Sequence, residues 1–143
     1  MSKKSDIAAA HLAGGFGCAT SVSLVFCEDY GLDAKKAAKL TCGLGGGCAS
    51  GEVCGAVSGA VMVIGLKYGQ EEAGDAETKA VCRAHVTQFI DKFKEQHKAL
   101  ACRDLLDCDT TTEEGFAIYL QKRGTVCVAL VKSAVEILEE QGF

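Results

Sequence analysis

Apolar residues recur every three to four positions along most of the chain, which is the spacing of one face of an α-helix. The clearest example runs from Asp75 to about Lys98, where one face carries the apolar residues Cys82, Val86, Phe89 and Phe93. No stretch alternates polar and apolar residues for long enough to form a strand. The pattern predicts an all-α fold, a compact bundle of six or seven helices without a sheet, with residues 1–143 as a single domain.

Glycine is expected to mark the ends of these helices, because the chain contains no proline. The expected helices cover 7–12, 16–29, 34–42, 51–68, 75–98 and 113–124, with a short turn at 102–107 and a last helix capped by Thr125. Asp33, Asp75 and the threonines at 110–112 are expected to cap helices. Residues 43–51 contain Gly45, Gly46 and Gly47 and are too rich in glycine for a helix, so they are predicted to form an irregular loop.

Composition excludes several classes of partner. The net charge of −4 offers no basic face for a phosphate backbone, so nucleic acid is not expected to bind. The longest apolar run, 53–66, is shorter than the roughly 20 residues of a membrane span, and no membrane association is predicted. The chain has nine cysteines and no recognisable export signal. We therefore expect a cytoplasmic protein whose cysteines are reduced thiols or ligands rather than a disulfide framework.

Four cysteines are candidates for chemistry: Cys18, Cys54, Cys102 and Cys127. Each is expected either on the apolar face of a helix or at a helix start, and three of them near a helix N-terminus, where the thiolate is favoured. Cys27 is expected to face the opposite side of the helix that carries Cys18. Cys48 lies in the glycine loop, six residues before Cys54, and is a further candidate as a resolving thiol or extra ligand. For any single cysteine, the alternative is simple packing as a small hydrophobic residue.

The spacing of the cysteines constrains the kind of site. No Cys-x-x-Cys is present, so the ligands would have to converge from separate segments. Four inward thiolates match the ligand count of an iron–sulfur cluster or of an all-cysteine zinc site. Gly51, Gly55 and Gly59 recur every four residues, which favours close backbone approach to a cluster, to another helix, or to a second copy in a homodimer.

The sequence also resembles a known family. Gly17-Cys18-Ala19, the run Cys54-Gly55-Ala56-Val57-Ser58-Gly59, Cys102 and Cys127 are similar to the shared positions of the C_GCAxxG_C_C family of redox-active proteins. The resemblance covers nearly the whole chain, and it implies that these four cysteines are the ligands or redox partners. Similar domains are fused to electron-transfer cytochromes and associated with an iron–sulfur centre.

The expected function is therefore redox chemistry. The first expectation is an iron–sulfur cluster bound through cysteine thiolates, passing electrons to an electron-transfer protein that the sequence does not identify. One alternative is a metal-free thiol–disulfide protein in which Cys54 attacks. The other is a non-catalytic binding domain, with zinc or no metal.

Overall fold

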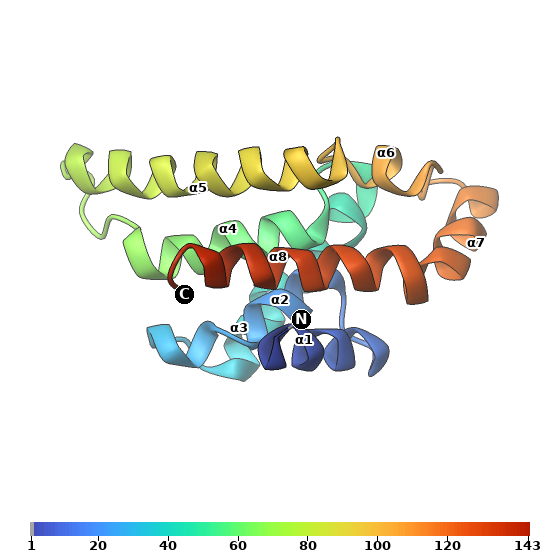
Figure 1. Cartoon of the computed structure of the whole chain (residues 1–143), viewed down its shortest axis with the longest axis horizontal. Coiled ribbons are helices and arrows are strands. Elements are labelled where there is room, and N and C mark those ends of the chain that lie inside the picture. The colour runs from blue at the N-terminus through green and yellow to red at the C-terminus, as the bar shows by residue number, and fades with distance from the viewer. Residues whose placement is uncertain (1) are drawn as a thin grey trace.

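The computed structural model describes residues 2–143 and consists of helices joined by short turns (Figure 1). The α-helices are α1 (Lys3–Ala13), α2 (Cys18–Leu24), α3 (Ala34–Thr41), α4 (Gly55–Tyr68), α5 (Ala76–His97), α6 (Cys102–Leu106), α7 (Glu113–Lys122) and α8 (Val128–Glu140). Shorter helical turns are η1 (Cys27–Tyr30), η2 (Cys42–Leu44), η3 (Gly47–Gly51) and η4 (Arg123–Cys127). Over the described residues the extended pairing consists of the single bridge Val53–Ala101, and the all-α prediction is confirmed. Seven of the α-helices have at least seven residues, and α6 has five.

The helices form a bundle with α4 and α8 in the middle (Figure 1). α5 runs along one side of this pair, α1, α2 and α3 cover the other side, and α6 and α7 close one end. The largest fully buried side chains are Phe26, Phe89 and Phe93, and the core they belong to draws on α1, α2, α4, α5, α6 and α8. Burial of these apolar faces provides the main stabilisation of the bundle.

Several predicted helix ends are confirmed, because they depend on local side-chain bonds. The Asp75 carboxylate accepts a hydrogen bond from the Thr78 backbone N–H and caps α5. The Thr112 hydroxyl accepts from the Gly115 N–H and caps α7. Asp33 caps α3 in the same way. These bonds satisfy backbone donors that a helix N-terminus otherwise leaves open.

Two boundaries before α3 differ from the prediction. α1 begins at Lys3 rather than at Ile7, because Ser2 and Ser5 form a reciprocal cap at its start. α2 ends at Leu24 instead of continuing to residue 29. The chain then forms η1, which ends at the left-handed residue Gly31 with φ +84°. The expected helix over 16–29 was therefore too long.

Two later boundaries also differ. α4 begins at Gly55 and not at 51, because Gly51 has φ +72° and Glu52 lies outside the helix. Thr125 does not cap the last helix, since the chain passes from α7 through η4 into α8 without leaving helical conformation. Within residues 2–143, no helix combines the length and hydropathy that crossing a bilayer requires.

Candidate four-cysteine site

The four candidate cysteines lie on four separate segments. Cys18 is the first residue of α2, Cys54 is the N-cap of α4, and Cys102 is the first residue of α6. Cys127 is the last residue of η4 and immediately precedes α8, so it lies near a helix start as expected, although the chain before it is already helical. Each is at most 5% exposed, and all four belong to one hydrophobic core cluster.

A short backbone bridge places Cys54 and Cys102 side by side. Val53 pairs with Ala101, the Cys54 N–H donates to Leu100 O at 2.8 Å, and the Cys102 N–H donates to Glu52 O at 2.6 Å. The first distance is that of an ordinary backbone hydrogen bond, and the second is slightly shorter. The bridge therefore fixes the starts of α4 and α6 relative to each other.

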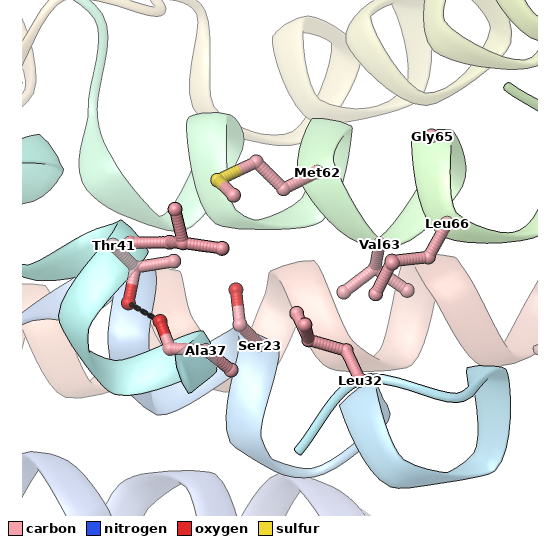
Figure 2. A pocket seen from close by; sticks show the side chains of 9 residues that line it. Ser23, Leu32, Ala37, Thr41, Met62, Val63, Gly65 and Leu66 are labelled. Atoms are coloured by element: carbon pink, nitrogen blue, oxygen red, sulfur yellow. Dashed lines mark hydrogen bonds between the residues drawn. The ribbon is translucent and has the colours of Figure 1, made fainter. Parts of the chain in front are cut away.

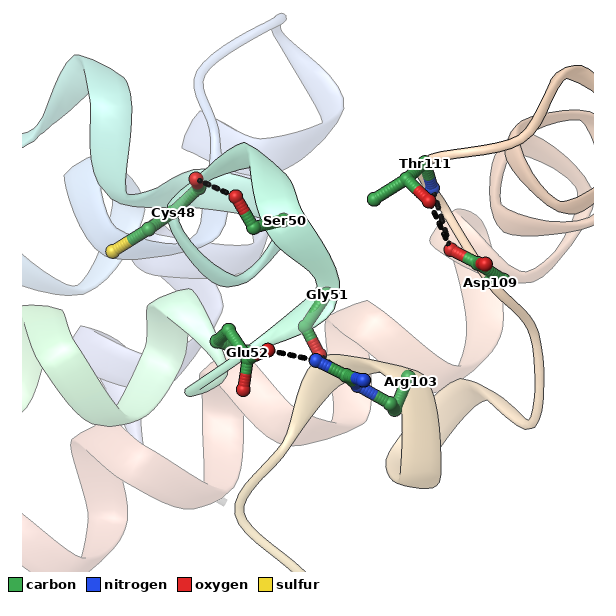
Figure 3. A network of polar contacts seen from close by, with 7 residues as sticks. All are labelled: Cys48, Ser50, Gly51, Glu52, Arg103, Asp109 and Thr111. Atoms are coloured by element: carbon green, nitrogen blue, oxygen red, sulfur yellow. Dashed lines mark hydrogen bonds and ion pairs between the residues drawn. The ribbon is translucent and has the colours of Figure 1, made fainter.

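Arg103, the residue after Cys102, strengthens this connection (Figure 3). Its Nε donates to Gly51 O at 3.1 Å, and its Nη2 forms an ion pair with the Glu52 carboxylate. Because Glu52 is two residues before Cys54, the side chain of Arg103 ties the segment preceding Cys54 to α6. The Arg103 charge is thereby paired with a carboxylate.

Glycines bring Cys18 next to Cys54. A Cβ added to Gly55 would lie 3.0 Å from Ala19 N and 3.1 Å from Cys18 Cβ, and one added to Gly59 would lie 2.6 Å from Ala19 O. The backbones of α2 and α4 are thus in direct contact, which only residues without a Cβ permit. This contact supports the helix-to-helix use of the glycine spacing. Gly55 and Gly59 are buried within the chain, so a homodimer would need another surface.

The four thiols are close enough to affect one another's ionisation. The Cys18 thiol hydrogen-bonds to Cys127, which raises the pKa of Cys18 well above its usual value and lowers that of Cys127. Burial raises the pKa of Cys54 to about 11, with a smaller contribution from the charge of Cys127. Burial, with smaller contributions from the charges of Cys54 and Cys127, raises the pKa of Cys102 to about 12. The structure thus brings all four predicted residues together.

The helix N-terminus acts on Cys54 in the expected direction, but the net shift of its pKa is the opposite one. The backbone N–H groups of Ala56 and Val57 do lower the pKa of Cys54, but burial raises it by more. A thiolate loses most of its solvation in an apolar core, and this outweighs the helix dipole. Without a bound cation, Cys18, Cys54 and Cys102 are neutral thiols at pH 7.

Two further residues of the site were missed by the sequence interpretation. Arg123 hydrogen-bonds the Tyr119 hydroxyl and lowers the pKa of Cys127, after the larger effect of the Cys18 hydrogen bond. The Tyr119 pKa is raised by burial and by the nearby Cys18 and Cys127. The available signal was spacing, since 119, 123 and 127 are four residues apart and share one helical face.

A cavity of about 210 Å³ opens beside the site. Its lining consists of Gly45, Gly46, Ala49, Thr110, Phe116 and Tyr119. Gly45 packs against Gly17, and its missing Cβ would lie 4.0 Å from Cys18 N. The cavity therefore lies next to the start of α2.

The glycine loop adopts an unusual backbone. Gly46, Gly47, Cys48 and Ala49 all have positive φ, between 54° and 67°, so they form a left-handed turn. A Cβ on Gly47 would lie 2.4 Å from Glu52 N, which explains the glycine there. Cys48 is exposed on this turn, and its role as a resolving thiol or extra ligand stays a prediction.

Cys27 is fully buried, contrary to the expectation that it faces away from the core. The reason is that the opposite face of α2, which carries Thr20 and Ser23, is buried as well. Burial raises the Cys27 pKa, with a further contribution from Glu28, and the thiol donates weakly to Leu24 O at 3.8 Å. Cys27 therefore has the burial of the four-cysteine site but different neighbours.

A second, larger cavity lies away from these thiols (Figure 2). It has a volume of about 270 Å³ between α2, α3 and α4, and its lining is almost entirely apolar. Figure 2 shows the Thr41 hydroxyl bonded back to Ala37 O, at 2.7 Å. The four cysteines are not among its lining residues.

The donor set matches the chemistry of a metal–thiolate centre. Four cysteine thiolates are the usual ligands of [2Fe–2S] and [4Fe–4S] clusters and of structural zinc. In the part of the chain that the structure describes, no three His, Cys, Asp or Glu side chains are already arranged to hold a metal ion.

Comparison with known families agrees with this picture. The model of the family described as "Putative redox-active protein (C_GCAxxG_C_C)" matches residues 16–141. The chain belongs to the C_GCAxxG_C_C family. This confirms the resemblance seen in the sequence and places the chain in a redox-active family. No curated protein and no solved structure matches the chain.

Proposed function

We propose that this C_GCAxxG_C_C protein binds an iron–sulfur cluster through Cys18, Cys54, Cys102 and Cys127 and transfers single electrons to another electron-transfer protein. The observation that carries the proposal is the convergence of four buried cysteines from four segments into one mutually interacting group. Helical bundles commonly build their cofactor sites in this way, from side chains on facing helices.

The electrostatics of the group support a cationic occupant. Cys18, Cys54 and Cys102 stay protonated because each thiolate would be poorly solvated in the apolar core and would be repelled by neighbouring thiolates. Ligation by iron compensates both costs, and a bound cluster would supply a centre that accepts and returns one electron. The proposal requires the four side chains to turn toward a common point, through changes of their χ1 rotamers.

The remaining residues of the site have supporting roles. The glycine contacts between α2 and α4 exclude water from the side of Cys18 and Cys54. The cavity beside Tyr119 and Gly45 opens next to the start of α2, where Cys18 lies, and we assign electron exchange with a partner to this side.

The test is a measurement of iron, zinc and acid-labile sulfide per chain, with an absorption spectrum, on protein purified without oxygen. We expect iron and sulfide in equal amounts in the wild type and their loss in Cys54→Ser. Cys27→Ser is the matched control, because Cys27 is as buried as Cys54 but has different neighbours. It is expected to keep the wild-type iron and sulfide.

Each other outcome contradicts the cluster. Zinc without sulfide would make the chain a zinc-stabilised domain. Equal iron loss in Cys27→Ser and Cys54→Ser would indicate misfolding rather than ligation. Absence of any metal from the anaerobic protein would leave thiol chemistry as the function.

A second candidate function rests on the hydrogen bond between Cys18 and Cys127. In a metal-free protein the Cys127 thiolate would attack one sulfur of a small disulfide and release one thiol. The Cys18 thiolate would then attack the mixed disulfide and release the second thiol. The products are a Cys18–Cys127 disulfide and two small thiols, which carry the two protons that the cysteines lost. Cys54 was expected to attack, but its pKa of about 11 leaves little thiolate at pH 7. This candidate predicts that titratable thiols fall by two per chain on oxidation by glutathione disulfide, and not in Cys127→Ser.

A further inference from the structure

Three basic side chains connect the cysteine-bearing segments, and they differ in how their charge is balanced. Arg103 is ion-paired with Glu52. Lys122 donates to Leu106 O at the end of α6. Arg123 donates from Nη2 to Phe16 O at 2.6 Å, two residues before Cys18.

Arg123, like Lys122 and unlike Arg103, has no carboxylate among the partners that the structure gives it over the described residues. Its hydrogen-bond partners within residues 2–143 are the Phe16 carbonyl and the Tyr119 hydroxyl. None of the ion pairs found in this part of the chain includes Arg123. A carbonyl and a neutral phenol orient a guanidinium without cancelling its charge. The positive charge of Arg123 therefore remains uncompensated by a carboxylate.

The position of Arg123 directs this charge to the site. Arg123 begins η4, the turn that ends at Cys127, and its bond to Phe16 O reaches the segment that leads into Cys18. It is half-buried, so water screens its charge less than that of a surface arginine. One side chain thus contacts both cysteine-bearing segments that carry the Cys18–Cys127 hydrogen bond.

We propose that Arg123 is a positioning residue of the four-cysteine site. It holds the Phe16–Cys18 segment against the junction of α7 and α8, and its positive charge stabilises the reduced, more negative state of the site. This inference rests on the proposed function, because it assumes that the site gains electrons. A charge in a partly buried environment is expected to change the reduction equilibrium by about tenfold.

The test compares the reduction potential of wild type with Arg123→Gln and Arg123→Lys. Each anaerobic, iron-loaded protein is titrated with dithionite in the presence of redox mediators and followed by absorption. Arg123→Gln is expected to lower the equilibrium constant for one-electron reduction about tenfold, which corresponds to ~59 mV. Arg123→Lys keeps the charge and is expected to stay within about twofold of wild type.

Matched variants separate charge from structure. Arg83→Gln removes an exposed arginine on α5, and no change in potential is expected. Leu120→Glu places a carboxylate three residues before Arg123 on an exposed position of α7, and we expect it to lower the potential, whereas Leu120→Gln does not. The Leu120 pair changes only an exposed side chain, so it tests the charge even if Arg123→Gln does not fold.

The outcomes distinguish this inference from the proposed function. A wild-type protein that accepts no electrons overturns the proposed function and the inference with it. A wild type that is reduced normally, with the same potential in Arg123→Gln, overturns the inference alone. Equal shifts in Arg123→Lys and Arg123→Gln would show that only the hydrogen-bond geometry matters, and would also refute the role of the charge.

Discussion

Replacing Gly59 by alanine should separate α2 from α4 and so disturb the four-cysteine site at Cys18, the first residue of α2. The new Cβ would lie 2.6 Å from Ala19 O and 2.8 Å from Ala19 Cα. Both atoms belong to the backbone of α2, so no side chain can rotate out of the way. The two helices must therefore move apart, or the contact remains strained.

The magnitude follows from two opposing effects. Overpacking of a well-packed contact typically costs about 1–3 kcal/mol. The upper half of this range applies here because the backbone must move. Alanine in place of glycine inside a helix returns about 1 kcal/mol. We expect Gly59→Ala to lower the free energy of unfolding by about 1–2 kcal/mol.

Gly65 provides the matched control on the same helix. A Cβ added there meets no atom within 4 Å, so Gly65→Ala gains helix propensity without a clash. It is expected to raise the free energy of unfolding by about 0.5–1 kcal/mol. The two substitutions are chemically identical and lie six residues apart, so the difference between them isolates the contact with α2.

The assay is urea unfolding of the reduced, metal-free proteins, followed by far-UV circular dichroism. Metal is removed because a ligand that binds only the folded state would add its own stabilisation. Iron loading of the same variants gives a second readout, and Gly59→Ala should load less than Gly65→Ala. A Gly59→Ala protein as stable as Gly65→Ala would refute the backbone contact between α2 and α4.

Two further predictions concern the metal-free thiols. At pH 8, iodoacetamide should modify the exposed Cys42 and Cys48 well before Cys54, because a pKa of about 11 leaves about one Cys54 thiol in a thousand ionised. Timed quenching and peptide mass spectrometry give the rates, and equal rates would contradict the burial of Cys54. The same shift predicts a pH-dependent stability, since the unfolded Cys54 thiol ionises near pH 9.0 and the folded one near 11. This contribution is fully present below pH 9 and is lost as the pH rises through 11, by about 2–3 kcal/mol. The difference between the urea midpoints of wild type and Cys54→Ser should shrink as the pH rises from 7.5 to 10.5. A constant difference would contradict the shifted pKa.

Much of the fold could be predicted because its determinants are local. The bounds of α5 follow from the apolar spacing and the Asp75 cap, and the start of α7 follows from Thr112. The start of α4 could not be predicted in the same way. Cys48 and Ala49 occupy left-handed conformations that cost about 1–2 kcal/mol each. Local preference argues against such a turn, which depends on the contact between Gly47 and Glu52.

The candidate site shows the same division. The inward position of Cys18 was predictable from helical spacing, but the burial of Cys27 was not, because the pattern gave no sign that both faces of α2 are buried. The thiol pKa values required knowledge of burial. A helix N-terminus contributes at most about 2 kcal/mol, and the environment of Cys54 exceeds this in the opposite direction.

The four cysteine-bearing segments are connected in a closed sequence of contacts. Glycine packing joins α2 to α4, the backbone bridge joins α4 to α6, and Lys122 joins α7 to α6 through Leu106 O. Arg123 completes the sequence by joining the α7–α8 junction to α2 through Phe16 O. Each of these contacts links residues distant in the sequence, so no single segment can form part of the site alone. The site therefore assembles only with the folded bundle, which explains how a chain without a Cys-x-x-Cys motif can still bring four thiols together.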